Sequence, residues 1–166
     1  MTTGNTSDLT LIPFRPELAD TFQRINEQWI SAMFQMETSD KNLLAHPQSA
    51  IIDIGGHIWF VEHRTRGVIG TAAIIPRQRG DFELTKMGVL EEARDLGAGA
   101  FLLAAVLGET KRLEVANLFL LTSSKCEAAI HLYRKAGFQD DAEIMDTYAK
   151  SYARCNVAMR WLPSSD

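Results

Sequence analysis

The first part of the chain shows apolar residues in two successive patterns, a short continuous run and then a helical repeat. Leu9–Phe14 is mostly apolar and predicts a strand. Pro16 suits the first turn of a helix, because its missing N–H has no helical partner to lose. Apolar residues then recur at three- to four-residue spacing over Leu18–Met33, and Ser39–Leu44 predicts a short second helix with the Ser39–Asp40 pair at its start.

Four apolar runs follow, separated by turn residues. The runs are Ala50–Ile54, His57–Glu62, Gly67–Ile75 and Phe82–Val89. Their lengths and the intervening glycines are typical of strands joined by tight turns. We therefore expect an antiparallel meander that ends in the strand Phe82–Val89.

The second half of the chain alternates helix and strand. A helix is expected from Gly97 to about Leu113, a buried strand over Asn117–Leu121, a helix over Lys125–Ala136 that ends at Gly137, and a last strand over Arg154–Leu162. A strand, a helix and a second strand form a βαβ unit, whose two strands run parallel. The predicted fold is α/β: a mixed sheet, with an antiparallel meander followed by a parallel pair and with helices on both faces.

Composition and charge narrow the class of protein. The chain has 166 residues, which suits one domain over residues 9–162 with a flexible tail at residues 1–8. The net charge of −4 disfavours non-specific nucleic-acid binding. The longest apolar run, Ala100–Leu107, is too short to span a membrane, and residues 1–8 lack an apolar signal core. Two separated cysteines suit a reducing compartment, so we expect a cytoplasmic protein without a membrane partner.

A glycine-bearing turn between Phe82–Val89 and the next helix carries the first candidate chemistry. Its spacing is Arg94-x-x-Gly97-x-Gly99. The first N–H groups of a helix have no internal partner, and glycine allows an anion to approach them closely, so this turn can bind a pyrophosphate. A tight connection with no ligand explains the same residues equally well. A P-loop is excluded because Phe101–Leu102 stands where Lys-Ser/Thr is needed, and a dinucleotide-binding turn lacks its acidic residue after Leu121.

A second motif, Leu132-Tyr133 followed by Gly137-Phe138, lies at the end of a later helix. Alone, Tyr133 would be read as a core tyrosine. Together, the two motifs, in this order and at this distance, resemble the GNAT superfamily of acetyl-CoA-dependent N-acetyltransferases. The resemblance covers nearly the whole chain, and it implies a GNAT-like fold in which the parallel strands splay apart.

The resemblance also implies where acetyl-CoA, as cosubstrate, would bind. The pantetheine arm would pair with Met87, Gly88 and Val89. The pyrophosphate would lie at Arg94 and on the amides of Leu96, Gly97, Ala98, Gly99 and Ala100. Two residues depart from the family pattern: Asp95 replaces a frequent glycine, and Cys126 replaces a frequent asparagine, whose polar role Ser123 or Ser124 could take. Cys126 itself is read as a small buried hydrophobe rather than a nucleophile, since no neighbouring cation is evident.

The expected reaction is direct attack of a neutral amine on the thioester. Glu83 is the candidate general base, on a strand face shared with Thr85 and Met87, and Tyr133 would protonate the leaving thiolate. An ordinary salt-bridged glutamate, paired with Lys86 or Arg154, is the alternative for Glu83. A backbone N–H of Val89 or Met87 would polarise the carbonyl.

The acceptor pocket is expected between the first helices and the meander, with Glu37, Asp40 and Trp59 as substrate-binding candidates because acidic residues attract a cationic amine. Trp29 and Phe34 are further candidates, although Trp29 lies on an apolar stripe that suits core packing. The four histidines lack metal-ligand spacing, so no metal is predicted.

The sequence therefore predicts an N-acetyltransferase acting on a primary amine of a small molecule or amino acid. A protein lysine or N-terminal acetyltransferase and a non-catalytic acetyl-CoA sensor remain as alternatives. Many relatives form homodimers, so a homodimer is among the assemblies expected.

Overall fold

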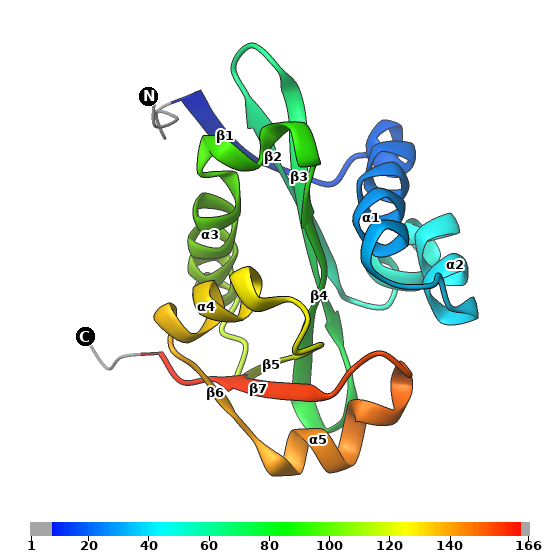
Figure 1. Cartoon of the computed structure of the whole chain (residues 1–166), viewed down its shortest axis with the longest axis vertical. Helices are drawn as coiled ribbons and strands as arrows, with labels where there is room; N and C mark the ends of the chain where they lie inside the picture. Colours follow the sequence, from blue (N-terminus) through cyan, green and yellow to red (C-terminus); the bar gives the residue numbers. More distant parts are fainter. Residues whose placement is uncertain (1–7, 164–166) are drawn as a thin grey trace.

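The computed structural model describes residues 8–163, so all but the last residue of the expected tail at residues 1–8 lies outside the described part. One seven-stranded sheet, in the order β1-β2-β3-β4-β5-β7-β6, organises this part of the chain (Figure 1). The strands are β1 (Leu9–Pro13), β2 (His57–His63), β3 (Gly67–Pro76), β4 (Asp81–Val89), β5 (Asn117–Thr122), β6 (Phe138–Asp140) and β7 (Val157–Trp161). The α-helices are α1 (Ala19–Met33), α2 (Thr38–Ala45), α3 (Ala98–Arg112), α4 (Glu127–Lys135) and α5 (Ala142–Tyr148).

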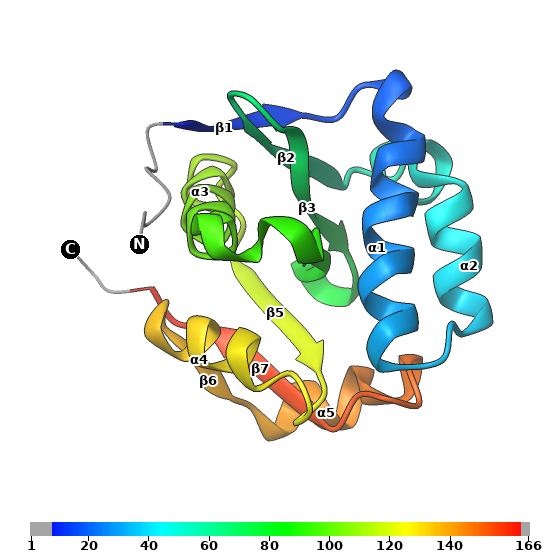
Figure 2. The same ribbon diagram turned by 45° about the horizontal axis from the view of Figure 1, so that its top comes forward.

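Strand direction confirms the predicted mixed sheet. Strands β1 to β4 form antiparallel neighbours, β4 and β5 run parallel, and β7 pairs antiparallel with both β5 and β6. Helices cover both faces: α3 and α4 lie on one, and α1, α2 and α5 on the other (Figures 1 and 2). The fold class predicted from the sequence is therefore the observed one.

One predicted strand is wrong. Ala50–Ile54 is not extended, because Gln48–Ile52 forms a single π-helical turn whose Ile51 is fully buried. β1 takes the outer place in the meander instead, paired with β2. A short apolar run does not by itself distinguish a strand from a buried helical turn, and here burial of Ile51 decided the outcome.

Two elements after Gly137 escaped the sequence analysis. Gly137 adopts a left-handed φ of 107° and turns the chain into β6, which is only three residues long. The following α5 begins at Asp141, whose carboxylate accepts a hydrogen bond from the N–H of Ile144 (2.9 Å). The final strand, β7, is shorter than the predicted Arg154–Leu162 because residues 154–156 form a connection rather than a strand.

Each face of the sheet has its own apolar core. Leu84, Leu102 and Leu118 belong to the core beneath α3, whereas Phe22, Ile30 and Ile75 belong to the core beneath α1 and α2. The alternation along β3 and β4 sends neighbouring residues to opposite cores. The sheet therefore separates two sides, and any opening between its strands connects them.

Candidate functional site

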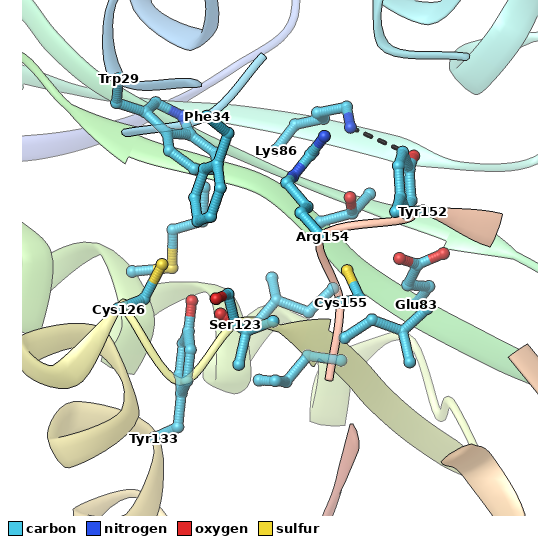
Figure 3. A pocket seen from close by; sticks show the side chains of 16 residues that line it. Trp29, Phe34, Glu83, Lys86, Ser123, Cys126, Tyr133, Tyr152, Arg154 and Cys155 are labelled. Atoms are coloured by element: carbon cyan, nitrogen blue, oxygen red, sulfur yellow. Dashed lines mark hydrogen bonds between the residues drawn. The ribbon is translucent and has the colours of Figure 1, made fainter. Parts of the chain in front are cut away.

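The parallel strands β4 and β5 part before they end. Their last paired residues are Leu84 and Leu120, although β4 continues to Val89 and β5 to Thr122. A narrow cavity of about 50 Å³ occupies this parting (Figure 3). It is lined by residues of α1 and the turn after it, β4, β5, α4 and the segment before β7, namely Trp29, Phe34, Glu83, Leu84, Thr85, Lys86, Met87, Leu120, Leu121, Thr122, Ser123, Cys126, Tyr133, Tyr152, Arg154 and Cys155.

A β-bulge in β4 shapes the cavity. Thr85 is opposite Ala73 and Gly88 is opposite Thr71, so three steps along β4 match two along β3. Lys86, inside the bulge, has a left-handed φ of 52°. The bulge interrupts the alternation of side chains along β4. Met87 packs on the α3 side of the sheet, whereas Lys86 reaches Asp40 of α2 on the other side. The expectation that Glu83 and Met87 share a strand face is therefore wrong.

Gly88 lets a tryptophan close one wall of the cavity. A Cβ at this position would overlap the indole ring of Trp29. The indole N–H donates to the side-chain oxygen of Asn26 (2.9 Å), which fixes the ring over β4. Trp29 thus lines the cavity as well as contacting the core, and Gly88 is required for its close approach.

Tyr133 reaches the cavity from α4. The residue is 8% exposed, its ring packs edge-on against Phe138, and its hydroxyl points into the cavity near Ser123 and Cys126 (Figure 3). The hydroxyl has no hydrogen-bond partner among the residues that the structure describes, and its oxygen is open to the cavity, since no fully buried side-chain oxygen there lacks a partner. Burial, and to a lesser extent the neighbouring Cys126, raises the pKa of Tyr133 far above its usual value, so the group stays protonated.

Glu83 lies at the opposite end of the cavity, in an ion pair that the sequence did not identify. Its side chain is 3% exposed, and Oε1 accepts a hydrogen bond from Arg77 Nε (2.9 Å). Arg77 Nη2 lies 2.9 Å from the same oxygen in the ion pair, so Oε2 is left without a partner among residues 8–163. The partner is therefore Arg77, not Lys86 or Arg154.

Asp40 is the centre of a buried charge network. It accepts from Lys86 Nζ (2.8 Å) and from two nitrogens of Arg154 (2.7 and 2.9 Å), and its own side chain is 0% exposed. Burial alone would raise the pKa of Asp40, but the Arg154 hydrogen bonds and the Lys86 charge outweigh it and hold that pKa well below its usual range. Tyr152 completes the network, since its hydroxyl accepts from Lys86 Nζ (3.1 Å).

Glu37 joins the same network at its outer edge. One carboxylate oxygen accepts from Arg154 (3.2 Å) and the other from the backbone N–H of Ala153 (3.1 Å). Glu37 and Asp40 also form a reciprocal capping box at the start of α2, so Glu37, rather than Ser39, is the N-cap. Both carboxylates expected to attract an amine are thus already engaged by cations of this chain.

Trp59 does not reach the cavity. It lies on β2, is 6% exposed, and belongs to the core beneath α3. Its ring stacks on His57, with centroids 5.5 Å apart. The structure therefore corrects its expected place in an acceptor pocket, because the alternation of β2 directs it to the core.

The predicted pyrophosphate turn has the expected local geometry. Gly97 adopts a left-handed φ of 74° immediately before α3, and no atom lies within 4 Å of a Cβ built there. The first helical bond of α3 runs from the N–H of Phe101 to the carbonyl of Gly97, so the N–H groups of Ala98, Gly99 and Ala100 precede the helical ladder. Arg94 is exposed on the 3-10 segment Glu91–Leu96 that leads into the turn.

The polar residues after β5 divide between the cavity and its rim. Ser123 is buried and Cys126 half-buried, and both line the cavity. Ser124 is exposed and instead bonds Asn156 through its N–H and hydroxyl. A second cysteine, Cys155, also lines the cavity, and burial raises its pKa to about 11, so it is a protonated thiol at neutral pH.

Several lining residues carried no signal in the sequence. Lys86, Tyr152, Arg154 and Cys155 come from β4 and from an irregular segment before β7. The features that single out this group are the positive φ of the buried Lys86 and its pairing with the distant Asp40. Neither the backbone angle nor a contact between distant residues can be read from the order of residues in the sequence. Within residues 8–163, no three His, Cys, Asp or Glu side chains gather as a metal site would require, and no helix is long and apolar enough to cross a bilayer.

Comparison with known proteins identifies the family. The family model of the acetyltransferase (GNAT) domain matches residues 55–140, just over half of the chain. No curated protein matches at a significant level. Among solved structures, a GNAT-family acetyltransferase from Staphylococcus aureus Mu50 has 18% sequence identity and a TM-score of 0.80, over 92% of this chain and 98% of its own.

Two further solved structures share the fold. A spermidine N-acetyltransferase SpeG chimera from Vibrio cholerae and hSSAT has 18% identity and a TM-score of 0.70, over 93% of this chain and 95% of its own. N-acetylglutamate synthase from Neisseria gonorrhoeae, complexed with coenzyme A and L-arginine, has 18% identity and a TM-score of 0.64, over 93% of this chain and 33% of its own. The family match, on a fold that these structures share, confirms the resemblance carried by the two motifs: the chain belongs to the GNAT family of acetyltransferases and is an acyltransferase.

Proposed function

We propose that this chain transfers an acetyl group from acetyl-CoA to a primary amine of a small molecule or amino acid, by direct attack of the amine in a ternary complex. The observation that carries the proposal is the parting of β4 and β5, with the amides of α3 at one side and the Tyr133 hydroxyl inside. One of the three similar structures named above was solved with coenzyme A. The names of two of them, a spermidine N-acetyltransferase and an N-acetylglutamate synthase, refer to N-acetylation.

The residues around the parting fit acetyl-CoA. The N–H groups of Ala98, Gly99 and Ala100 offer donors at the positive end of the α3 dipole, and Gly97 leaves open space beside them. Arg94, exposed at the rim, would add a cation for the phosphates. Among the described residues, the edge of β4 at Met87, Gly88 and Val89 has no strand partner on the β5 side, so its backbone groups can bond the amides of the pantetheine arm.

Tyr133 is suited to protonate the leaving thiolate. Its hydroxyl is inside the cavity and unpaired within the described chain, and its raised pKa keeps the proton available. In the transfer, the amine nitrogen forms a bond to the acetyl carbon as the carbon–sulfur bond breaks. The sulfur then takes the Tyr133 proton, and the amine gives up a proton to a base.

Glu83 is the proposed base, acting directly or through water. Arg77 occupies Oε1 and leaves Oε2 at the cavity. The Arg77 pair also fixes the carboxylate, which a proton acceptor requires. Ser123 and Cys126 line the same cavity, where they would contact the pantetheine end, whereas Ser124 would contribute only at the rim.

Calorimetry and thiol release test the proposal together. Acetyl-CoA and coenzyme A should bind with saturation and raise the melting temperature, whereas NAD and ATP should not. Thiol should then appear when an amine is added. Coenzyme binding without turnover on any amine or lysine peptide would support a sensor, and turnover on peptides alone would support a protein acetyltransferase. Well-folded protein that binds neither form of coenzyme A would overturn the proposal.

A charge placed in the α3 turn sharpens this test. Ala100→Asp should lower coenzyme affinity about tenfold, because a carboxylate beside the amides repels phosphate. The helix itself should tolerate the change, since acidic residues suit a helix N-terminus. Ala104→Asp, exposed one turn further along α3, is the matched control and should change the affinity much less. Equal effects of the two variants would place the phosphates elsewhere.

A further inference from the structure

A second, wider pocket opens beside the catalytic cavity. It lies between the connection from α1 to α2 with the first turn of α2, Lys125 two residues before α4, and the segment leading into β7. The two pockets share Phe34 and Arg154, so a ligand in the outer pocket would reach the cavity past these side chains (Figure 3). This outer pocket is therefore placed to hold the part of an acceptor that does not react.

The ionisable side chains that line the outer pocket are mainly cationic. They are Lys41, Lys125, Arg154 and one carboxylate, Glu37. The positive balance stands out in a chain whose net charge is −4. Lys125 and Arg154 both approach the ring of Phe34, at 5.5 and 5.7 Å from its centroid, so two cations flank the residue at the passage to the cavity.

The nearby carboxylates balance Arg154 and Lys86 but leave the charges of Lys41 and Lys125 uncompensated. Both oxygens of Glu37 accept hydrogen bonds from residues 153 and 154. Asp40 lies behind the pocket wall, paired with both Lys86 and Arg154, so this inner group carries no excess negative charge. Lys41 and Lys125 are exposed, and neither forms an ion pair with a carboxylate in the described part of the chain.

We propose that the acceptor is an amine that also carries a carboxylate, which binds among Lys41, Lys125 and Arg154 while the amino group enters the cavity past Phe34. The inference rests on the proposed function and names its acceptor class. It reverses the sequence-based expectation that Glu37 and Asp40 attract a cationic amine, because those carboxylates are occupied within the protein. A polyamine would bring further positive charge to a pocket in which the charges of Lys41 and Lys125 are already uncompensated, which costs electrostatic energy.

A panel of acceptors of equal length tests the proposal. Glycine, 4-aminobutyrate and 6-aminohexanoate would be compared with ethylamine, butylamine and hexylamine, and with putrescine and spermidine. We expect kcat/KM for the best amino acid to exceed that of its uncharged counterpart at least tenfold, and the diamines to be poorest. Raising the ionic strength from about 0.02 M to about 0.5 M should narrow the gap by screening the lysines. Preference for polyamines or simple amines over every amino acid would overturn the proposal.

Two variants tie the preference to the pocket. Lys125→Gln and Lys41→Gln should each raise KM for the carboxylate acceptor about threefold to fivefold, as expected for exposed charge pairs, and leave uncharged amines unaffected. Lys135→Gln removes an exposed lysine at the far end of α4 and is the matched control. If Lys125→Gln instead weakened coenzyme binding and left acceptor KM unchanged, the cations would serve the coenzyme and the proposal would fall.

A binding measurement keeps this test separate from the proposed function. With coenzyme A present, the same amino acids should raise the melting temperature of the wild-type protein, and less that of Lys41→Gln/Lys125→Gln. Failure of the proposed function appears as absent coenzyme binding or absent turnover on all amines. Failure of the acceptor assignment appears as turnover or stabilisation by amines without any advantage for the carboxylate.

Discussion

The two walls of the cavity differ in the chemical groups that form them. On the α3 and α4 side, an apolar core supports backbone N–H groups and one hydroxyl, that of Tyr133. On the side of α1 and α2, buried charges of Asp40, Lys86 and Glu83 are held in ion pairs. The backbone N–H groups of the first wall belong to the adjacent residues 98–100, whereas Asp40 and Arg154 are 114 residues apart. The proposed coenzyme turn is thus local in sequence, while the charges beside the proposed acceptor site are assembled over long distances.

Removing the central carboxylate of the charged wall should have the largest effect. Asp40→Ala leaves Lys86 and Arg154 buried without their partner and should lower the free energy of unfolding by about 3–5 kcal/mol. Urea denaturation measures the change. Asp140→Ala, which breaks the exposed pair with Arg134, is the control and should cost less than about 1 kcal/mol. Similar losses for the two variants would show that the network contributes little to stability.

The same network predicts a pH dependence. The pKa of Asp40 is lower in the folded chain than in the unfolded one, so its contribution is complete above the unfolded value of about 3.9 and declines as the pH falls below it. The wild-type protein should therefore lose stability steeply below about pH 4. Asp40→Asn should flatten this part of the curve, and an identical acid limb in both proteins would contradict the assignment.

Changing the hydroxyl of the apolar wall should affect turnover alone. Tyr133→Phe should lower kcat about 100-fold, the lower end of the range for a general acid, with KM and the coenzyme-induced melting shift retained. The raised pKa of Tyr133 means that it should not cause an alkaline limb below about pH 10. Steady-state kinetics across pH gives the answer, and a native rate for Tyr133→Phe would remove this residue from the mechanism.

Glu83 tests whether the charged wall also takes part in catalysis. Glu83→Gln should lower kcat/KM about 100-fold and remove the acid limb of the pH–rate profile, since an amide cannot accept the proton. Arg77→Gln should preserve a base but leave the carboxylate less fixed, so its loss should be smaller. An unchanged profile in Glu83→Gln would leave Glu83 a structural ion-pair partner only.

Gly88 joins the two walls, and its replacement should have the smallest effect of the set. Gly88→Ala places a methyl group against the Trp29 ring and should destabilise the protein by about 1–3 kcal/mol. Gly108→Ala is the control: it lies in α3 with no atom near its Cβ position, so it should stabilise by up to about 1 kcal/mol. Thermal unfolding compares them, and equal shifts would contradict the packing argument.

The sequence predicted most of the fold because its periodic segments are long. The helices α1 and α3 and the strands β2 to β5 were recovered, and the two motifs identified the family. Ala50–Ile54 was misassigned because a five-residue apolar run has no diagnostic period. The segment β6–α5 was missed because a strand of three residues and a helix of seven are also too short to show a diagnostic period.

The chain by itself determined the family and the glycine turn before α3, because backbone conformation and exposed N–H groups there depend on adjacent residues. Only the tertiary structure decided the charges around the cavity and the outer pocket. The bulge at Lys86 turned that side chain toward Asp40, and the segment before β7 brought in Arg154. Electrostatic compensation depends on distance in space rather than in sequence, so a carboxylate that looks available in the sequence is neutralised in the fold.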